Sequence, residues 1–122
     1  MAWSVAMQHD AAPELIEEAV ALARAGTGRS PKTGMYFNTL GVVLVRAAQW
    51  DEAVSVLRKA CELRSGGDAY DWYPLAIALK HQGQREEAQN WFDRAEQWRR
   101  DHPLDDSDLN QLRDAATAAI RP

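Results

Sequence analysis

Large apolar residues recur at helical spacing in two segments of the chain. They are Phe37, Leu40 and Leu44 in the first segment and Trp72, Leu75 and Leu79 in the second. Spacings of three and four residues place each set on one face of an α-helix. A second helical pattern follows each set, with alanines at Ala53 and Ala60 and at Ala88 and Ala95. The chain is therefore predicted to be all-α.

The pattern repeats along the chain. Three segments share two acids followed by an alanine: EEAVALARA from Glu17, DEAVSVLRKA from Asp51 and EEAQNWFDRA from Glu86. Their intervals are 34 and 35 residues. In this alignment Gly41 matches Ala76, so a small residue lies at the same place on both first helices, where a second helix must approach closely. Each repeat is therefore predicted to be a pair of antiparallel helices, with Ala48 or Gly83 in the turn.

These features resemble the tetratricopeptide repeat family, whose period is about 34 residues. The residues that carry the resemblance are Phe37, Leu40, Gly41, Leu44, Trp50, Ala53, Leu57 and Ala60, then Trp72, Leu75, Ala76, Leu79, Gly83, Ala88, Phe92 and Ala95. The resemblance implies a right-handed α-solenoid of antiparallel helix hairpins. The pattern is also similar to tetratricopeptide regions appended to large bacterial signalling proteins such as Ser/Thr protein kinases, although no kinase residue is carried over.

The predicted organisation is a single domain over residues 1–122. It comprises a degenerate first repeat (1–32), a second repeat (33–66), a third repeat (67–102) and a capping helix (103–122), about seven helices in all. In the first repeat, 14–25 supplies the second helix and 2–8 a shortened first helix. The last helix carries an apolar stripe of Leu109, Leu112, Ala116, Ala119 and Ile120. Such a stripe is expected to cover the neighbouring repeat, which cannot bury its own face alone.

Pro74 interrupts the pattern of the third repeat. We expect it to lie within about the first turn of its helix, where a missing N–H costs little.

Composition narrows the classes of partner. The net charge is −4 with Lys and Arg spread along the chain, which disfavours nucleic acid. The longest run without a polar residue is LGVVLV, too short to span a membrane. Cys61 is the only cysteine, and we expect it to be a packing residue. With no recognisable secretory signal, a cytoplasmic protein is expected.

The stretch GTGRSPKT, from Gly26 to Thr33, is one substitution short of a phosphate-binding loop. The last glycine of such a loop is replaced by Pro31, which has no N–H to offer a phosphate. The stretch also follows a predicted helix that ends near Ala25, whereas a phosphate loop follows a strand. We therefore expect a connecting turn and no bound nucleotide.

No other motif predicts catalysis, a cofactor or a metal. The acidic pairs are expected in the first turn of each second helix, where negative charge favours the helix dipole. The run DHPLDDSD lacks the glycine and glutamate of a calcium loop, so Asp105, Asp106 or Ser107 is expected to cap the last helix. His9 and His81 are expected to be solvated. Trp91 and Trp98 share a face and serve either packing or an aromatic patch for a partner.

The resemblance implies a non-catalytic protein-interaction module, an adaptor or scaffold, that binds a peptide or helix on its concave face. The predicted contact residues are Asn38, Val42, Val45, Arg46, Tyr70, Tyr73, Ile77, Lys80 and His81. Because this set holds two cations and no acid, an acidic or carboxylate-terminated peptide is the expected ligand. The alternative is a self-associating element of a larger signalling protein that forms homo-oligomers through the solenoid ends.

Overall fold

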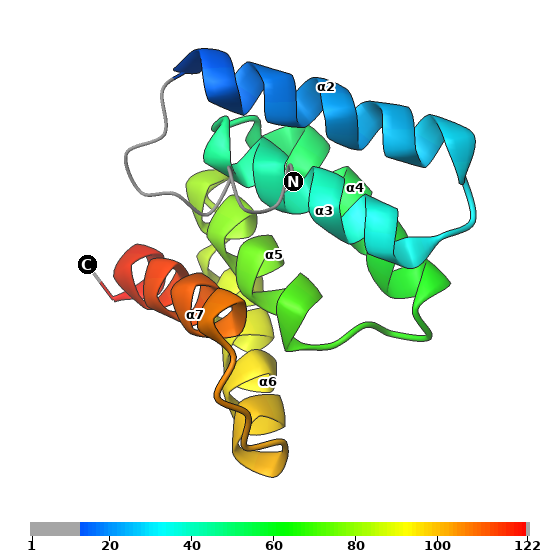
Figure 1. Cartoon of the computed structure of the whole chain (residues 1–122). Coiled ribbons are helices and arrows are strands. Elements are labelled where there is room, and N and C mark those ends of the chain that lie inside the picture. Colours follow the sequence, from blue (N-terminus) through cyan, green and yellow to red (C-terminus); the bar gives the residue numbers. More distant parts are fainter. Residues whose placement is uncertain (1–12, 122) are drawn as a thin grey trace.

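The computed structural model describes residues 13–121, which form six α-helices and no strand (Figure 1). The helices are α2 (Pro13–Arg29), α3 (Gly34–Arg46), α4 (Trp50–Leu63), α5 (Ala69–His81), α6 (Arg85–Asp101) and α7 (Ser107–Ile120). The all-α prediction is confirmed. The helix predicted over 2–8 lies outside the described residues.

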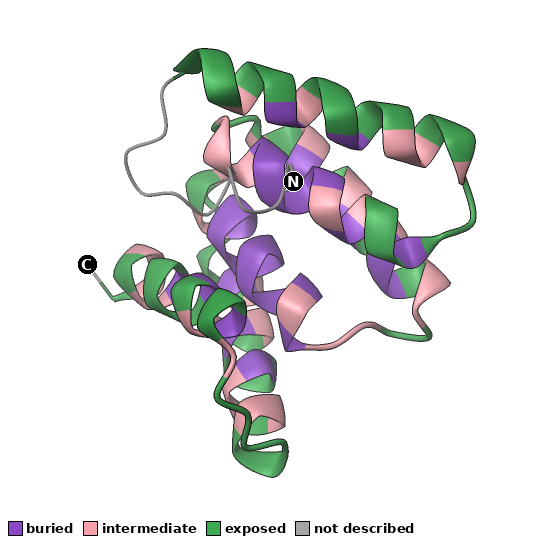
Figure 2. Cartoon of the chain, viewed as in Figure 1, coloured by how far each residue is buried: buried purple, intermediate pink, exposed green. Residues whose placement is uncertain are grey.

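The helices form two hairpins flanked by single helices. α3 pairs with α4 and α5 pairs with α6, while α2 packs on α3. The last helix, α7, packs mainly on α5 and only lightly on α6. As a result α5 has neighbours on several sides, and Figure 2 shows it buried along most of its length. The core is therefore centred on α5.

The turns within the two hairpins are built alike. Gln49 N–H donates to Leu44 O at 2.9 Å, and Gln84 N–H donates to Leu79 O at 3.0 Å, 35 residues later. Ala48 and Gly83, at the same place in each turn, both have left-handed backbone, with φ of 59° and 83°. Only glycine adopts this conformation without strain, so the alanine costs the first hairpin about 1–2 kcal/mol.

Small residues allow the paired helices to approach closely. A Cβ atom at Gly41 would lie 2.4 Å from the Leu57 side chain on α4. Ala76 occupies the equivalent place on α5 and is fully buried. The alanines predicted to pack on the second helices are fully buried as well: Ala53, Ala60, Ala88 and Ala95. The predicted interhelical contacts are thus confirmed.

The first helix of the described residues, α2, differs from its prediction at both ends. α2 continues to Arg29, four residues past the expected end, and Gly26 and Gly28 are both within it. Ser30 N–H donates to Gly26 O at 2.9 Å, the hydrogen bond of a continuing helix. The first half of the stretch GTGRSPKT, residues 26–29, is therefore helical, and the second half forms a short turn into α3. Because α2 starts at Pro13, Glu17 and Glu18 lie in its second turn, not its first.

The second acid of two of the repeated pairs also bridges successive repeats. Glu52 on α4 accepts hydrogen bonds from the Arg24 guanidinium on α2. In the same way Glu87 on α6 accepts from Arg58 on α4 at 2.8 Å. Each pair joins helices whose backbones are not in contact. Glu52 and Glu87, two of the acids predicted to favour the helix dipole, thus also have a defined cationic partner one repeat earlier.

Candidate functional site

A groove of ≈ 410 Å³ lies between α3, α5 and α7. Its lining is largely apolar and comprises Val42, Val45, Arg46, Pro74, Ile77, Gln111, Leu112, Asp114, Ala115 and Ala118. Two charged side chains lie on opposite walls, Arg46 on α3 and Asp114 on α7. An apolar floor with a few polar groups is the usual lining of a binding pocket.

Four of the nine predicted contact residues line this groove: Val42, Val45, Arg46 and Ile77. They come from the last turns of α3 and the second half of α5. Val42 and Ile77 are almost fully buried and form the floor, while Val45 and Arg46 are half-buried. This part of the predicted surface is brought together by the packing of α3 on α5.

Asn38 lies in the core, away from the groove. It is 2% exposed, and its Nδ2 donates to Tyr70 O and to Asp71 Oδ1, each at 2.9 Å. The first of these bonds compensates for Pro74, which lacks the N–H that would have bonded to Tyr70 O within α5. Pro74 is the sixth residue of α5, beyond the first turn where we expected it. Asn38, predicted as a contact residue, therefore supplies a hydrogen bond that α5 cannot make for itself.

The two predicted tyrosines bind acids of neighbouring helices. Tyr73 is fully buried, and its hydroxyl donates to Glu96 Oε1 on α6 at 2.6 Å. The Tyr70 hydroxyl donates to Asp106, the residue that caps α7. Burial and this hydrogen bond raise the pKa of Tyr70 to about 12, and burial and Glu96 raise that of Tyr73. Neither hydroxyl lines the groove, so both tyrosines hold helices together.

Lys80 and His81 lie at the end of α5 and do not line the groove either. The His81 ring is exposed and stacks on Trp50, with ring centroids 3.9 Å apart. Lys80 is half-buried. This stacking lies beside the turns of the two hairpins.

The wall formed by α7 was not predicted. Leu109, Leu112 and Ala116 are buried as the apolar stripe indicated. The groove is lined mainly by a neighbouring face with Gln111, Asp114, Ala115 and Ala118. Asp106 caps the helix, as one of the three expected candidates, by accepting from the N–H groups of Asp108 and Leu109 at 2.9 and 3.3 Å. Small exposed alanines carry no sequence signal for a binding wall.

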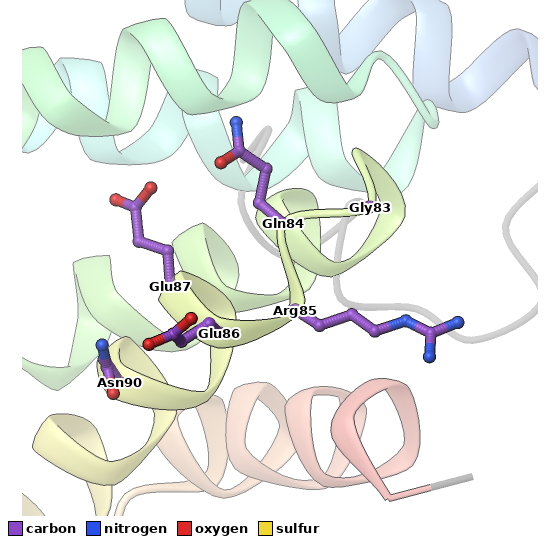
Figure 3. A pocket seen from close by; sticks show the side chains of 6 residues that line it. All are labelled: Gly83, Gln84, Arg85, Glu86, Glu87 and Asn90. Carbon is purple, nitrogen blue, oxygen red and sulfur yellow. The ribbon is translucent and has the colours of Figure 1, made fainter.

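A larger depression at the start of α6 does not form a converging site. Figure 3 shows its lining residues, Gly83, Gln84, Arg85, Glu86, Glu87 and Asn90. The Arg85 side chain extends away from Glu86 and Asn90. Glu87 is already bound to Arg58. Divergent polar side chains around an open depression give a ligand few simultaneous contacts.

Cys61, the one thiol of the chain, is buried. Burial, followed by the negative charge of Asp71, raises the pKa of the Cys61 thiol to about 11, which disfavours the nucleophilic thiolate. Within residues 13–121 no three His, Cys, Asp or Glu side chains gather as metal ligands do. No helix in that range is both long and apolar enough to cross a membrane.

The tryptophans of α6 pack on their neighbours. The ring centroids of Trp91 and Trp72 lie 6.1 Å apart, and the Arg94 guanidinium lies 4.6 Å from each of these centroids. Trp98 contacts Tyr70 edge-on and stacks on His102. Both tryptophans are half-buried, which fits the packing interpretation and leaves part of each ring accessible.

Comparison with known families identifies the first hairpin. A family model described as tetratricopeptide repeat matches residues 33–65, which contain α3 and α4. Residues 33–65 are a tetratricopeptide repeat. The turn and packing of this repeat recur in α5 and α6, as described above. Searches of curated proteins and of solved structures found no match. Tetratricopeptide repeats are in general non-catalytic modules that bind proteins.

Proposed function

We propose that this chain is a non-catalytic adaptor or scaffold that binds a peptide or helix of a partner protein in the α3–α5–α7 groove. The observation that carries the proposal is the lining of this groove, seven apolar residues from three helices with Arg46 and Asp114 at its sides. An apolar anchor side chain gains most when it enters such a lining, since burial removes its surface from water.

Charge sets the expected orientation of the ligand. Arg46 lies on the α3 wall and Asp114 on the α7 wall. An acidic residue of the partner is favoured beside Arg46 and disfavoured beside Asp114. We therefore expect an acidic peptide that places an apolar side chain on the floor and its carboxylates towards α3. The reversal Arg46→Glu should weaken such a peptide by at least about 1 kcal/mol.

The test uses peptides selected from a random display library on the intact chain. Ala115 is exposed on the groove wall, so Ala115→Arg blocks the groove without entering the core. The matched control is Ala21→Arg on α2, an exposed alanine on a helix that does not contact α7. We expect Ala115→Arg to weaken the selected peptides at least about tenfold and Ala21→Arg to leave them unchanged.

Equal binding by both variants would place the contact elsewhere and reject the groove. Tyr73→Ala is unsuitable as a test, because Tyr73 is buried and its removal damages the core. Light scattering on the parent chain distinguishes the alternative, self-association through the ends of the repeat array. A concentration-dependent oligomer that Ala115→Arg does not alter would favour that alternative.

A further inference from the structure

A second cleft, of ≈ 290 Å³, lies between α6 and α7. It exists because α7 packs mainly on α5 and leaves a gap along α6. Four side chains line it: Glu96, Arg99, Arg100 and Arg113. Three arginines around one small cleft are notable in a chain whose net charge is −4.

Glu96 neutralises one of these arginines. Its Oε1 accepts from Arg113 Nε at 2.8 Å and from the Tyr73 hydroxyl, and its Oε2 accepts from Arg113 Nη2 at 3.3 Å. Burial pushes the pKa of Glu96 upward, but the hydrogen bonds from Arg113 and Tyr73 outweigh it, so the pKa is lowered overall. Glu96 is therefore ionised at neutral pH, and its charge balances that of Arg113.

The other two arginines have no carboxylate bound to them among residues 13–121. Arg100 Nη2 donates to the neutral amide oxygen of Gln97 at 2.9 Å. Arg99 Nη1 is buried and has no hydrogen-bond partner in the described part of the chain. Buried donors are nearly always satisfied in native proteins, so this atom indicates a missing acceptor.

One acid, Asp106, lies near enough to interact electrostatically with Arg99. The pKa of Asp106 is lowered, mainly by its hydrogen bond from Tyr70 and to a smaller extent by the positive charge of Arg99. Its two oxygens already accept from the Tyr70 hydroxyl and from the N–H groups of Asp108 and Leu109. Asp106 is therefore held as the cap of α7, and it does not line the cleft. The four side chains that do line the cleft carry three positive charges and one negative charge, an excess of two.

We propose that the α6–α7 cleft binds the phosphate group of a phosphorylated serine or threonine in a partner protein. A phosphate monoester carries a charge of about −1.5 to −2 at pH 7, which matches the two remaining guanidinium groups. Its oxygens accept paired hydrogen bonds from a guanidinium and would satisfy Arg99 Nη1. A single carboxylate would balance only one of the two charges. This site is separate from the α3–α5–α7 groove.

The test is an NMR titration of the full chain at constant ionic strength. The ligands are a short glycine peptide with one phosphoserine and the same peptide with serine or glutamate at that place. Of the three peptides, we expect only the phosphopeptide to cause saturable shifts in α6 and α7. Inorganic phosphate should shift the same signals with weaker affinity. Arg99→Gln and Arg100→Gln should each weaken binding about tenfold, the loss expected for a charge-assisted hydrogen bond.

The matched control is Arg85→Gln, an exposed arginine at the start of the same helix with the same change in charge. We expect its affinity to stay within about twofold of the parent. An equal loss in Arg85→Gln would mean unspecific attraction and overturn the proposal. Equal binding of the glutamate peptide would overturn the assignment to phosphate. Arg100 is exposed, so its variant keeps the test valid if Arg99→Gln does not fold.

Discussion

At the scale of single residues, the pairing of Asn38 with Pro74 explains a polar side chain in the core. A proline inside a helix leaves the carbonyl four residues earlier without its N–H partner. In α5 that carbonyl belongs to Tyr70, and the Asn38 amide supplies the hydrogen bond from α3. The same amide also binds Asp71, which is fully buried. The Asn38 side chain thus links the two hairpins and supplies the hydrogen bond that Pro74 cannot donate.

We predict that the cost of Asn38→Ala depends on Pro74. In the parent the substitution removes the Asn38 hydrogen bonds to the Tyr70 carbonyl and to Asp71 Oδ1, while Asp71 Oδ2 keeps its bonds from Arg64 and from the Asp68 N–H. We expect a cost of about 2–3 kcal/mol in unfolding free energy. With Pro74→Ala the helix supplies its own N–H to Tyr70, so the cost should fall by about 1 kcal/mol. Urea unfolding of the four proteins of this double-mutant cycle measures the difference.

Asn90→Ala is the control for the chemical change, because Asn90 is exposed on α6. It should alter stability by less than about 0.5 kcal/mol. If Asn38→Ala costs the same with and without Pro74, the proposed compensation is incorrect.

At the scale of elements, α7 is the helix on which both proposed sites depend. It forms one wall of the groove and one side of the arginine cleft. Three of its side chains are buried, Leu109, Leu112 and Ala116, and its N-cap is held by Tyr70. A short helix of this kind gains its stability from tertiary packing more than from its own propensity.

We predict that removing residues 109–122 lowers the melting temperature and makes the protein aggregate. The truncation uncovers apolar surface of α5, and exposed apolar patches drive association. Circular dichroism melts and light scattering measure both effects. An unchanged melt with a monomeric truncated chain would contradict the assigned role of α7.

The point substitution Leu109→Ala tests the same packing in a full-length chain. Leu109 is fully buried, so its truncation should cost about 2–5 kcal/mol. Leu104→Ala is the matched control, because Leu104 is 46% exposed in the preceding loop. The control should change stability by less than about 0.5 kcal/mol.

At the scale of the whole molecule, acids paired with other helices dominate the response to pH. Hydrogen bonds from Arg24, Arg58 and Tyr70 lower the pKa values of Glu52, Glu87 and Asp106 respectively. The pKa of Glu96 is lowered as well, although its burial acts in the opposite direction. Asp71 is the opposite case, because burial raises its pKa in spite of Arg64. Four of these five groups favour the folded state when ionised.

We predict that stability decreases as the pH falls below about 4.5. A carboxyl whose pKa is lower in the folded state binds protons more readily when the chain is unfolded. Its contribution is therefore present above the unfolded pKa, about 4.3 for Glu and 3.9 for Asp, and is lost as pH falls through the folded pKa. Melting temperatures between neutral and acidic pH measure the loss, which Glu96→Gln should reduce. A melting temperature that rises on acidification would contradict the prediction.

The sequence was a good guide wherever packing is set by neighbours along the chain. Leu40, Gly41 and Leu57 could be placed in the core of a hairpin because helical spacing and the 35-residue interval fix which face they occupy. The candidate site was less predictable. Asn38 and Tyr73 share a region with the groove residues, but their polar atoms are turned to Tyr70 and Glu96, and spacing does not specify a hydrogen-bond partner.

By itself the sequence determined that the chain is helical, that its hairpins repeat and which small residues lie between the helices. These properties follow from local spacing and side-chain size. Only the tertiary structure decided that α7 lies against α5, and with it the groove and the arginine cleft. The apolar stripe of α7 requires a buried face but does not specify which helix covers it. The position of α7 depends on contacts with both helices of the preceding hairpin: Tyr70 of α5 with Asp106, 36 positions apart, and Glu96 of α6 with Arg113, 17 positions apart.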